Sequence, residues 1–277
     1  HIVWGDSQTG YVIYRVYVPD KGLDRAAGVP LPTITLVGTD GNPQLLSPCQ
    51  STTTDQSSST PQSVAQSMRS AATNGPLSRL ISGTCPPPTD PLGVLNHRKR
   101  AVFAQVPHGH MFGNPANNYI EAPLLCLEPD KVIVVRAKAP VFPDTYNGGS
   151  IFQPAIPGTI QVRYWSMCNN NEVSPFPVVG CQPDWATKLD SDGFFTYVVS
   201  PDESGVTPPA PPAWLPPDAT WLPWGDPSLP NVLIYRNMLP ANFSLTGDYY
   251  PRGVFCDKQL FIGLGWRACF AAVGATF

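Results

Sequence analysis

The sequence predicts an all-β protein of the β-sandwich or jelly-roll type, and three observations carry this prediction. The 277-residue chain contains 34 prolines, which interrupt helices but are tolerated in loops and at strand edges. Short runs of β-branched and aromatic residues are bounded by turn residues, as strands are. The length allows one large β domain or two such modules packed together, with long proline-rich loops and one or two short helices.

The first third of the chain is expected to hold two strands and a helix. The strands cover residues 11–18 and 31–37, and the second strand ends at a tight turn formed by residues 39–42. Residues 60–73 begin with an N-cap threonine and a proline, and their apolar residues recur at helical spacing. This segment is therefore expected to form a short helix.

The strongest strand signals lie in the last two thirds of the chain. Two runs rich in Val, Ile, Tyr and Trp, both within Lys131–Cys168, flank a Pro/Gly-rich connection, so we expect them to pair in the core. Residues 201–230 should lie extended and be fixed onto the sheet by their tryptophans. Further strands are expected over residues 101–106, 118–126, 193–200 and 231–237, with a short helix near 257–264.

The chain is expected to divide near residue 97, after a proline-rich loop. Residues 1–97 then form an N-terminal β segment with one short helix, and residues 98–277 form a β-sandwich module.

Composition excludes several classes of partner. Charged residues make up 13% of the chain, about half the usual share, and the net charge is −3 with no long basic block. No nucleic acid or anionic membrane surface is therefore expected as a partner, and no apolar run reaches the length of a membrane span. Such low charge suits a secreted or cell-surface protein, extracellular or periplasmic, or one whose surface is partly covered by neighbouring proteins.

The seven cysteines are scattered singly, which argues against zinc-ribbon and haem-attachment motifs and favours disulfides in an oxidising compartment. Proximity in the sequence predicts the pairs Cys168–Cys181, Cys256–Cys269 and Cys49–Cys85. Cys126 lies in an apolar run and is expected to be a buried free thiol.

Several segments together resemble a family of secreted bacterial proteins of unknown function. They are residues 14–22, 132–145, 162–168, 221–225 and 235–240. A second resemblance, to DUF1214-type β-sandwich modules, rests on residues 164–166, 192–193, 221–223 and 236. Members of the first family look longer than this chain, which implies that His1 is a truncation or processing point and that a neighbouring subunit supplies the missing β segment. The family brings no catalytic residues to this sequence.

Histidines offer one candidate metal site. His108 and His110 are two residues apart, so on a strand both would face the same side and could bind one metal ion. If His1 is a true N-terminus, its amine and imidazole could join them around copper, as in a histidine-brace monooxygenase. The alternative is that these histidines bond to backbone groups in a Pro/Gly-rich loop, with no cofactor.

Arginines and tryptophans offer a candidate ligand site. Arg136 and Arg163 interrupt apolar strands and could bind an anion, or be paired with a carboxylate if buried. Trp221 and Trp224 could stack against sugars, or could instead build the core and fix the proline-rich segment. No nucleophile elbow or phosphate-binding loop is present in the sequence.

These observations favour an extracellular, non-catalytic structural or binding protein that associates with copies of itself or with another extracellular protein. An exposed apolar strand edge near the N-terminus would suit strand addition between subunits. Two alternatives remain open: a copper-type extracellular oxidase or polysaccharide-active enzyme that uses the histidines, and a carbohydrate-binding module that binds glycans through its tryptophans.

Overall fold

A computed structural model describes residues 16–23, 32–45, 85, 99–106, 114–173, 176–206, 208–240 and 245–275. These residues form twelve strands and one α-helix, so the predicted all-β class is confirmed. The strands are β1 Thr35–Val37, β2 Pro43–Leu45, β3 Arg100–Ala101, β4 Ala104–Val106, β5 Asn117–Leu125, β6 Lys131–Lys138, β7 Tyr164–Asn171, β8 Val178–Pro183, β9 Phe194–Ser200, β10 Thr220–Pro223, β11 Asn231–Met238 and β12 Arg252–Asp257; the helix is α2 Lys258–Ala272.

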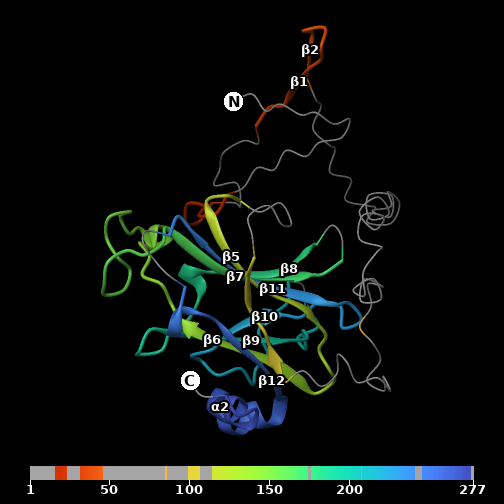
Figure 1. Ribbon diagram of the computed structural model, residues 1–277, viewed down its shortest axis with the longest axis vertical. Helices are drawn as coiled ribbons and strands as arrows, with labels where there is room; N and C mark the ends of the chain where they lie inside the picture. Colours follow the sequence, from red (N-terminus) through yellow and green to blue (C-terminus); the bar gives the residue numbers. More distant parts are fainter. Residues whose placement is uncertain are drawn as a thin grey trace.

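The body consists of two five-stranded sheets that share one core (Figure 1). One sheet has the strand order β10-β9-β6-β12-β3, and the other has the order β4-β5-β11-β7-β8. All neighbours are antiparallel except β9 and β10. Inward-facing side chains of both sheets meet in a cluster that contains Trp165, Phe195, Tyr197, Trp224 and Tyr235. Burial of these large aromatic side chains stabilises the contact between the two layers.

β6 is buried on both faces, which explains the apolar run of residues 132–135. Ile133 and Val135 point into the core between the sheets, whereas Val132 and Val134 point toward a second cluster beneath α2. The prediction that the two strand-forming runs within Lys131–Cys168, now β6 and β7, pair with each other is wrong. β6 pairs with β9 and β12, and β7 pairs with β11 and β8. The connection between them crosses from one sheet to the other, so the two strands lie in opposite layers of the core.

The expected strand over residues 101–106 is also divided between the layers. β3 pairs with β12 in one sheet, and β4 pairs with β5 in the other. Phe103 lies at the crossing point, is buried, and belongs to the shared core. A single run of strand-forming residues can therefore serve two sheets when the residue at the crossing fills the space between them.

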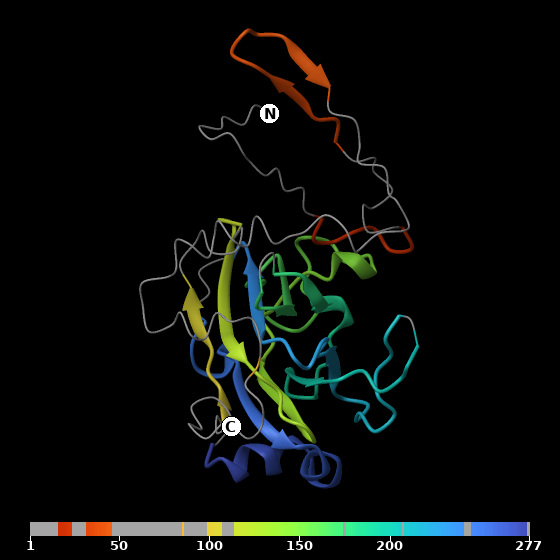
Figure 2. The same cartoon turned by 90° about the vertical axis from the view of Figure 1, so that its right-hand side faces the viewer.

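α2 covers the outer face of the sheet that contains β6 (Figures 1 and 2). The Asp257 side chain caps the helix by accepting from the backbone N–H groups of Gln259 and Leu260. Residues 257–264 were expected to be a short helix; the helical segment is longer, with a break at Gly265. Phe261 and Phe270, on either side of that break, are both buried in the cluster beneath α2.

The proline-rich segment over residues 201–230 is fixed by aromatic side chains, as predicted. Trp221 and Trp224 are buried, and Trp214 packs edge-on against Phe261 of α2. The segment also contributes β10, a parallel neighbour of β9.

Other expected elements are shorter or lie outside the described residues. β1 covers only Thr35–Val37, and the predicted tight turn follows it; the strand β2 after this turn, which pairs with β1, was not predicted. Residues 16–18, the described part of the expected strand 11–18, are not in a strand. The expected helix over residues 60–73 and the division near residue 97 fall outside the described residues.

Three disulfides join six of the seven cysteines. The predicted pairs Cys168–Cys181 and Cys256–Cys269 are confirmed. The predicted pair Cys49–Cys85 and the free thiol at Cys126 are wrong, because Cys85 is joined to Cys126. Disulfides of this number indicate an oxidising compartment, as expected for an extracellular or periplasmic protein.

Alkylation without reduction should therefore label one cysteine per chain. Because six cysteines pair within the chain, the label should appear on the peptide that contains Cys49. Mass spectrometry of the denatured, unreduced and alkylated protein tests this expectation. A label on the peptide that contains Cys126 would contradict the pairing.

Candidate functional site

The β1–β2 hairpin, residues 32–45, is the most exposed ordered segment of the described chain, and we call it the arm hairpin. It lies at one end of the longest axis of the molecule, away from the two five-stranded sheets (Figures 1 and 2). Every residue of both strands is exposed, and Leu36, Val37 and Leu45 expose 52%, 64% and 64% of their surface. A two-stranded hairpin without a third strand is marginally stable in water. An apolar hairpin of this kind is typical of a segment that packs against another protein.

The turn of the arm hairpin carries its one charged residue, Asp40. The Asn42 side chain donates to Asp40 Oδ2 over 2.9 Å, and the Asn42 backbone N–H donates to Asp40 Oδ1 over 3.1 Å. The side-chain bond from Asn42, followed by the backbone bond, holds the pKa of Asp40 below its usual range. The tip of the hairpin therefore carries a negative charge at neutral pH.

Residues 16–23, which precede the arm hairpin in the chain, are anchored to the body. The Tyr17 ring contacts the Tyr164 ring edge-on, and the Tyr17 hydroxyl accepts from the side-chain amides of Asn114 and Asn117. Lys21 Nζ donates to Asn147 Oδ1 over 2.9 Å. These contacts hold residues 16–23 on the body of the protein.

An aromatic stack continues this anchor. Tyr146 stacks on Trp185 with ring centroids 4.5 Å apart, and Trp185 in turn contacts Tyr164. Lys21 Nζ lies 6.0 Å from the centroid of the Tyr146 ring. Tyr146 and Trp185 are half-buried and Tyr164 is buried, so these ring contacts extend the anchor from the surface into the body.

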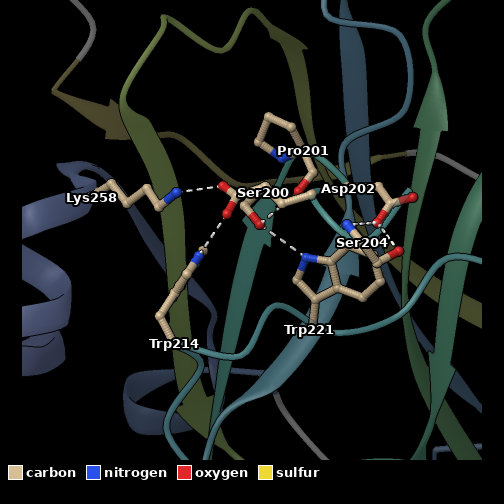
Figure 3. A network of polar contacts seen from close by, with 8 residues as sticks. Ser200, Pro201, Asp202, Ser204, Trp214, Trp221 and Lys258 are labelled. Carbon is tan, nitrogen blue, oxygen red and sulfur yellow. Dashed lines mark hydrogen bonds and ion pairs between the residues drawn. The ribbon is translucent and has the colours of Figure 1, made fainter. Parts of the chain in front are cut away.

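A groove of about 590 Å³ is the second feature that could bind a ligand. It lies between the β5–β6 turn, the end of β9 and the start of α2, and the Cys85–Cys126 disulfide forms part of its wall. Glu203 bridges two elements at its edge: it pairs with Lys258 of α2 and accepts from Trp214 Nε1 over 3.0 Å. Figure 3 shows Lys258, on α2, and Trp214, on the proline-rich segment, converging on this point.

The Ser200 hydroxyl lines this groove and is a candidate nucleophile, but it already makes two hydrogen bonds within the protein. Its Oγ accepts from Trp221 Nε1 over 2.9 Å and donates to the carbonyl of Pro201 (Figure 3). A serine nucleophile needs a base within hydrogen-bond reach. An indole N–H and a peptide carbonyl cannot act as that base, so this arrangement is structural.

A buried carboxyl lies beneath the aromatic anchor. Asp184 follows β8 and begins the 3-10 helix Asp184–Ala186. Its two oxygens accept from the backbone N–H groups of Trp165 and Trp185 over 3.1 and 2.8 Å. Burial raises its pKa to about 7, against the opposing effects of these two bonds and of the Arg163 charge.

The predicted ligand residues do not form one site. Arg136 is buried on β6 and pairs with Asp190, whereas Arg163 donates to Thr145 Oγ1 over 3.0 Å. Trp221 and Trp224 are buried, so neither ring is available to stack against a sugar. The prediction that these tryptophans bind a ligand is corrected, because their size makes them core-filling residues.

The predicted metal ligands His1, His108 and His110 lie outside the described residues. Among the residues that the structure does describe, no group of three or more His, Cys, Asp or Glu side chains could hold a metal ion. Within the same residues, no helix has the length and apolar character needed to cross a membrane.

The sequence did not identify Asp184, Glu203 and Asp190 as hydrogen-bond or ion-pair partners of other residues in the interior and at the groove. A sequence signal existed only for Asp190, which opens an Asp-Ser-Asp-Gly turn. The roles of the other two depend on contacts between segments that are distant in the chain, such as Glu203 with Lys258.

Comparisons with known proteins do not show which family this chain belongs to. No protein-family model and no curated protein matches it. Among solved structures, an uncharacterized protein from Burkholderia cenocepacia is similar over 59% of this chain and 36% of its own, with 14% identity and a TM-score of 0.35. A protein from Vibrio parahaemolyticus is similar over 50% of this chain and 30% of its own, with 18% identity and a TM-score of 0.31.

The chain spans about a third of the length of these two solved structures. The resemblances to secreted bacterial proteins of unknown function and to DUF1214-type modules stay predictions.

Proposed function

We propose that this protein is a secreted, non-catalytic structural protein of the β-sandwich type that associates with copies of itself. The observation that carries this proposal is the arm hairpin: an apolar, exposed β-hairpin at one end of a disulfide-linked body.

Physical chemistry supports an interacting role for the arm hairpin. Exposing Leu36, Val37 and Leu45 to water costs free energy that burial in an interface would recover. Among the residues that the structure describes, no further strand pairs with the outer edges of this hairpin, and such edges pair readily with other chains. Residues 16–23, which precede the arm hairpin in the chain, are themselves held on the body by Tyr17 and Lys21.

The composition supports the same proposal. Only 13% of the residues are charged, and charged residues are depleted at the centre of protein interfaces. In the groove, the Ser200 hydroxyl is hydrogen-bonded to Trp221 and to the Pro201 carbonyl, neither of which can act as a base, and this supports a non-catalytic role.

Sedimentation velocity over a range of protein concentrations tests this proposal. We expect the mean sedimentation coefficient to rise with concentration, and the variant Leu36→Thr with Val37→Thr to abolish the rise. Threonine keeps the preference of both positions for a strand while removing apolar surface. A wild-type protein that stays monomeric at the highest concentration reached would overturn the proposal.

A further inference from the structure

A second exposed apolar surface lies on α2. We define the α2 outer face as Ile262, Gly263, Leu264, Arg267, Ala271 and Ala272, all of which are exposed. Leu264 alone exposes 71% of its surface. The opposite side of α2 buries Phe261, Cys269 and Phe270 against the sheet. A helix that is apolar on both sides is normally buried on both, so the outer face is expected to contact another molecule.

The charges of the two apolar surfaces are opposite. α2 contains Lys258 and Arg267 and no acidic residue. Lys258 is paired with Glu203, whereas Arg267 is exposed and its guanidinium lies 4.5 Å from the centroid of the Trp266 ring. The arm hairpin carries Asp40 as its one charged residue. An apolar surface with one anion thus matches an apolar surface with one cation.

A pocket of about 250 Å³ borders the α2 outer face, between Leu264 and the segment that contains Pro216. Its lining holds one cation, Arg267, and one anion, Asp218. Arg267 thus belongs both to the α2 outer face and to the lining of this pocket, and the pocket adds space beside Leu264.

The two surfaces lie at opposite ends of the molecule. Figures 1 and 2 show the arm hairpin at one end of the longest axis and α2 at the other, with the two sheets between them. A contact between the arm hairpin and α2 in this arrangement joins two different copies of the chain.

We propose that the arm hairpin of one copy docks on the α2 outer face of the next copy, so that the protein assembles head to tail. This inference rests on the self-association proposed above and names the surface that receives the hairpin. A contact between two different surfaces is heterologous: each added copy leaves one hairpin and one helix face free. The assembly therefore grows into open chains or closed rings, and it does not stop at a symmetric dimer.

Two variants test the roles of the two surfaces independently. The hairpin variant combines Leu36→Thr with Val37→Thr, and the helix variant combines Ile262→Gln with Leu264→Gln. Glutamine forms helices well, and both changed positions are exposed, so the helix variant is expected to fold. Phe152→Gln is the matched control, because Phe152 exposes 86% of its surface on a loop that belongs to neither surface. Circular dichroism checks that each variant is folded.

The expected results follow from the geometry. Wild-type protein and the Phe152→Gln control should form species larger than a dimer as concentration rises. Each surface variant alone should stay monomeric. An equimolar mixture of the two variants should form a 1:1 dimer and nothing larger, because one intact hairpin then meets one intact helix face.

Other outcomes would overturn the inference in distinguishable ways. A hairpin variant that is monomeric beside a helix variant that associates as wild type does would overturn the receiving role of α2 and leave self-association standing. A dimer formed by either variant alone would indicate a symmetric contact and overturn the head-to-tail arrangement. A wild-type protein that is monomeric throughout would overturn both proposals.

Discussion

Replacing Asp190 with asparagine is expected to lower the free energy of unfolding by about 1.5–3 kcal/mol, the range for a hydrogen bond to a charged group, because Arg136 is buried whereas the Asp190 side chain is 25% exposed. Arg136 is buried on β6, where its guanidinium lies 4.0 Å from the Trp266 ring centroid and 4.8 Å from that of Phe194. It donates to Thr196 Oγ1 over 2.8 Å and pairs with Asp190. Asparagine removes the negative charge and turns an amide toward the guanidinium donors.

The substitution Asp190→Asn tests the effect of the charge alone, because asparagine can keep the hydrogen bonds of the local turn. Asp190 Oδ1 accepts from the backbone N–H groups of Asp192 and Phe194, and the amide oxygen of asparagine can accept the same bonds. The measurement is urea unfolding followed by tryptophan fluorescence. Asp192→Asn is the matched control: it removes the same charge from an exposed position in the same turn, and we expect a change within about 0.5 kcal/mol.

A double variant tests the physical reason. Arg136→Met together with Asp190→Asn removes both charges and keeps an apolar side chain between the two rings. Replacing a buried ion pair by apolar residues is often neutral, so the double variant should recover most of the lost stability. If Asp190→Asn alone costs less than about 1 kcal/mol, the pair contributes no more than an exposed one does.

The sequence predicted the central strands well because their signals are local. β6, β9 and β11 are runs of β-branched and aromatic residues, and each is buried along most of its length. The two disulfides that close short loops, Cys168–Cys181 and Cys256–Cys269, could be predicted for the same reason. Cys85–Cys126 spans 41 residues, and no local signal reports which distant cysteine the fold brings close.

Among the strands that were not predicted, β8 and β12 each contain a glycine that weakens the strand pattern. A Cβ at Gly180 of β8 would lie 2.7 Å from the Pro223 side chain, and a Cβ at Gly253 of β12 would lie 2.8 Å from that of Ala101. Close packing of neighbouring segments requires glycine at both positions. The same residues lower the strand propensity of the sequence, so tertiary contacts override the local signal.

The candidate site was predicted only in part. The turn at residues 39–42 indicated the hairpin, but its exposure depends on its distance from the sheets, which the sequence does not encode locally. Arg136 was expected to bind an anion or to be paired, and it is paired with Asp190. The α2 outer face was missed because an apolar helix near the end of a chain reads as a core element.

Wild-type stability is expected to fall by about 4 kcal/mol between pH 4 and pH 8 through Asp184 alone. Burial raises the pKa of Asp184 to about 7, whereas an aspartate in the unfolded chain has a pKa of about 3.9. Between these values the folded protein keeps a proton that the unfolded chain has released. The free energy of unfolding therefore decreases as pH rises through this window, and it levels off above about pH 7.

The variant Asp184→Asn isolates this contribution because its side chain does not titrate. The amide oxygen can accept from only one of the backbone N–H groups of Trp165 and Trp185, so a constant loss of about 1 kcal/mol is expected at every pH. The quantity that tests the idea is the slope of stability against pH, measured by urea unfolding from pH 4 to pH 8. We expect the wild type to lose about 4 kcal/mol more than the variant over this range.

Asp248→Asn serves as the control, because Asp248 is exposed in a surface turn and its replacement should leave the wild-type slope unchanged. Parallel slopes for the wild type and Asp184→Asn would mean that Asp184 ionises at its ordinary pKa in the folded protein. The carboxylate would then have to be stabilised by its two backbone donors and the nearby Arg163 charge strongly enough to offset its burial. A steeper wild-type slope means instead that desolvation dominates and that the proton is part of the folded core.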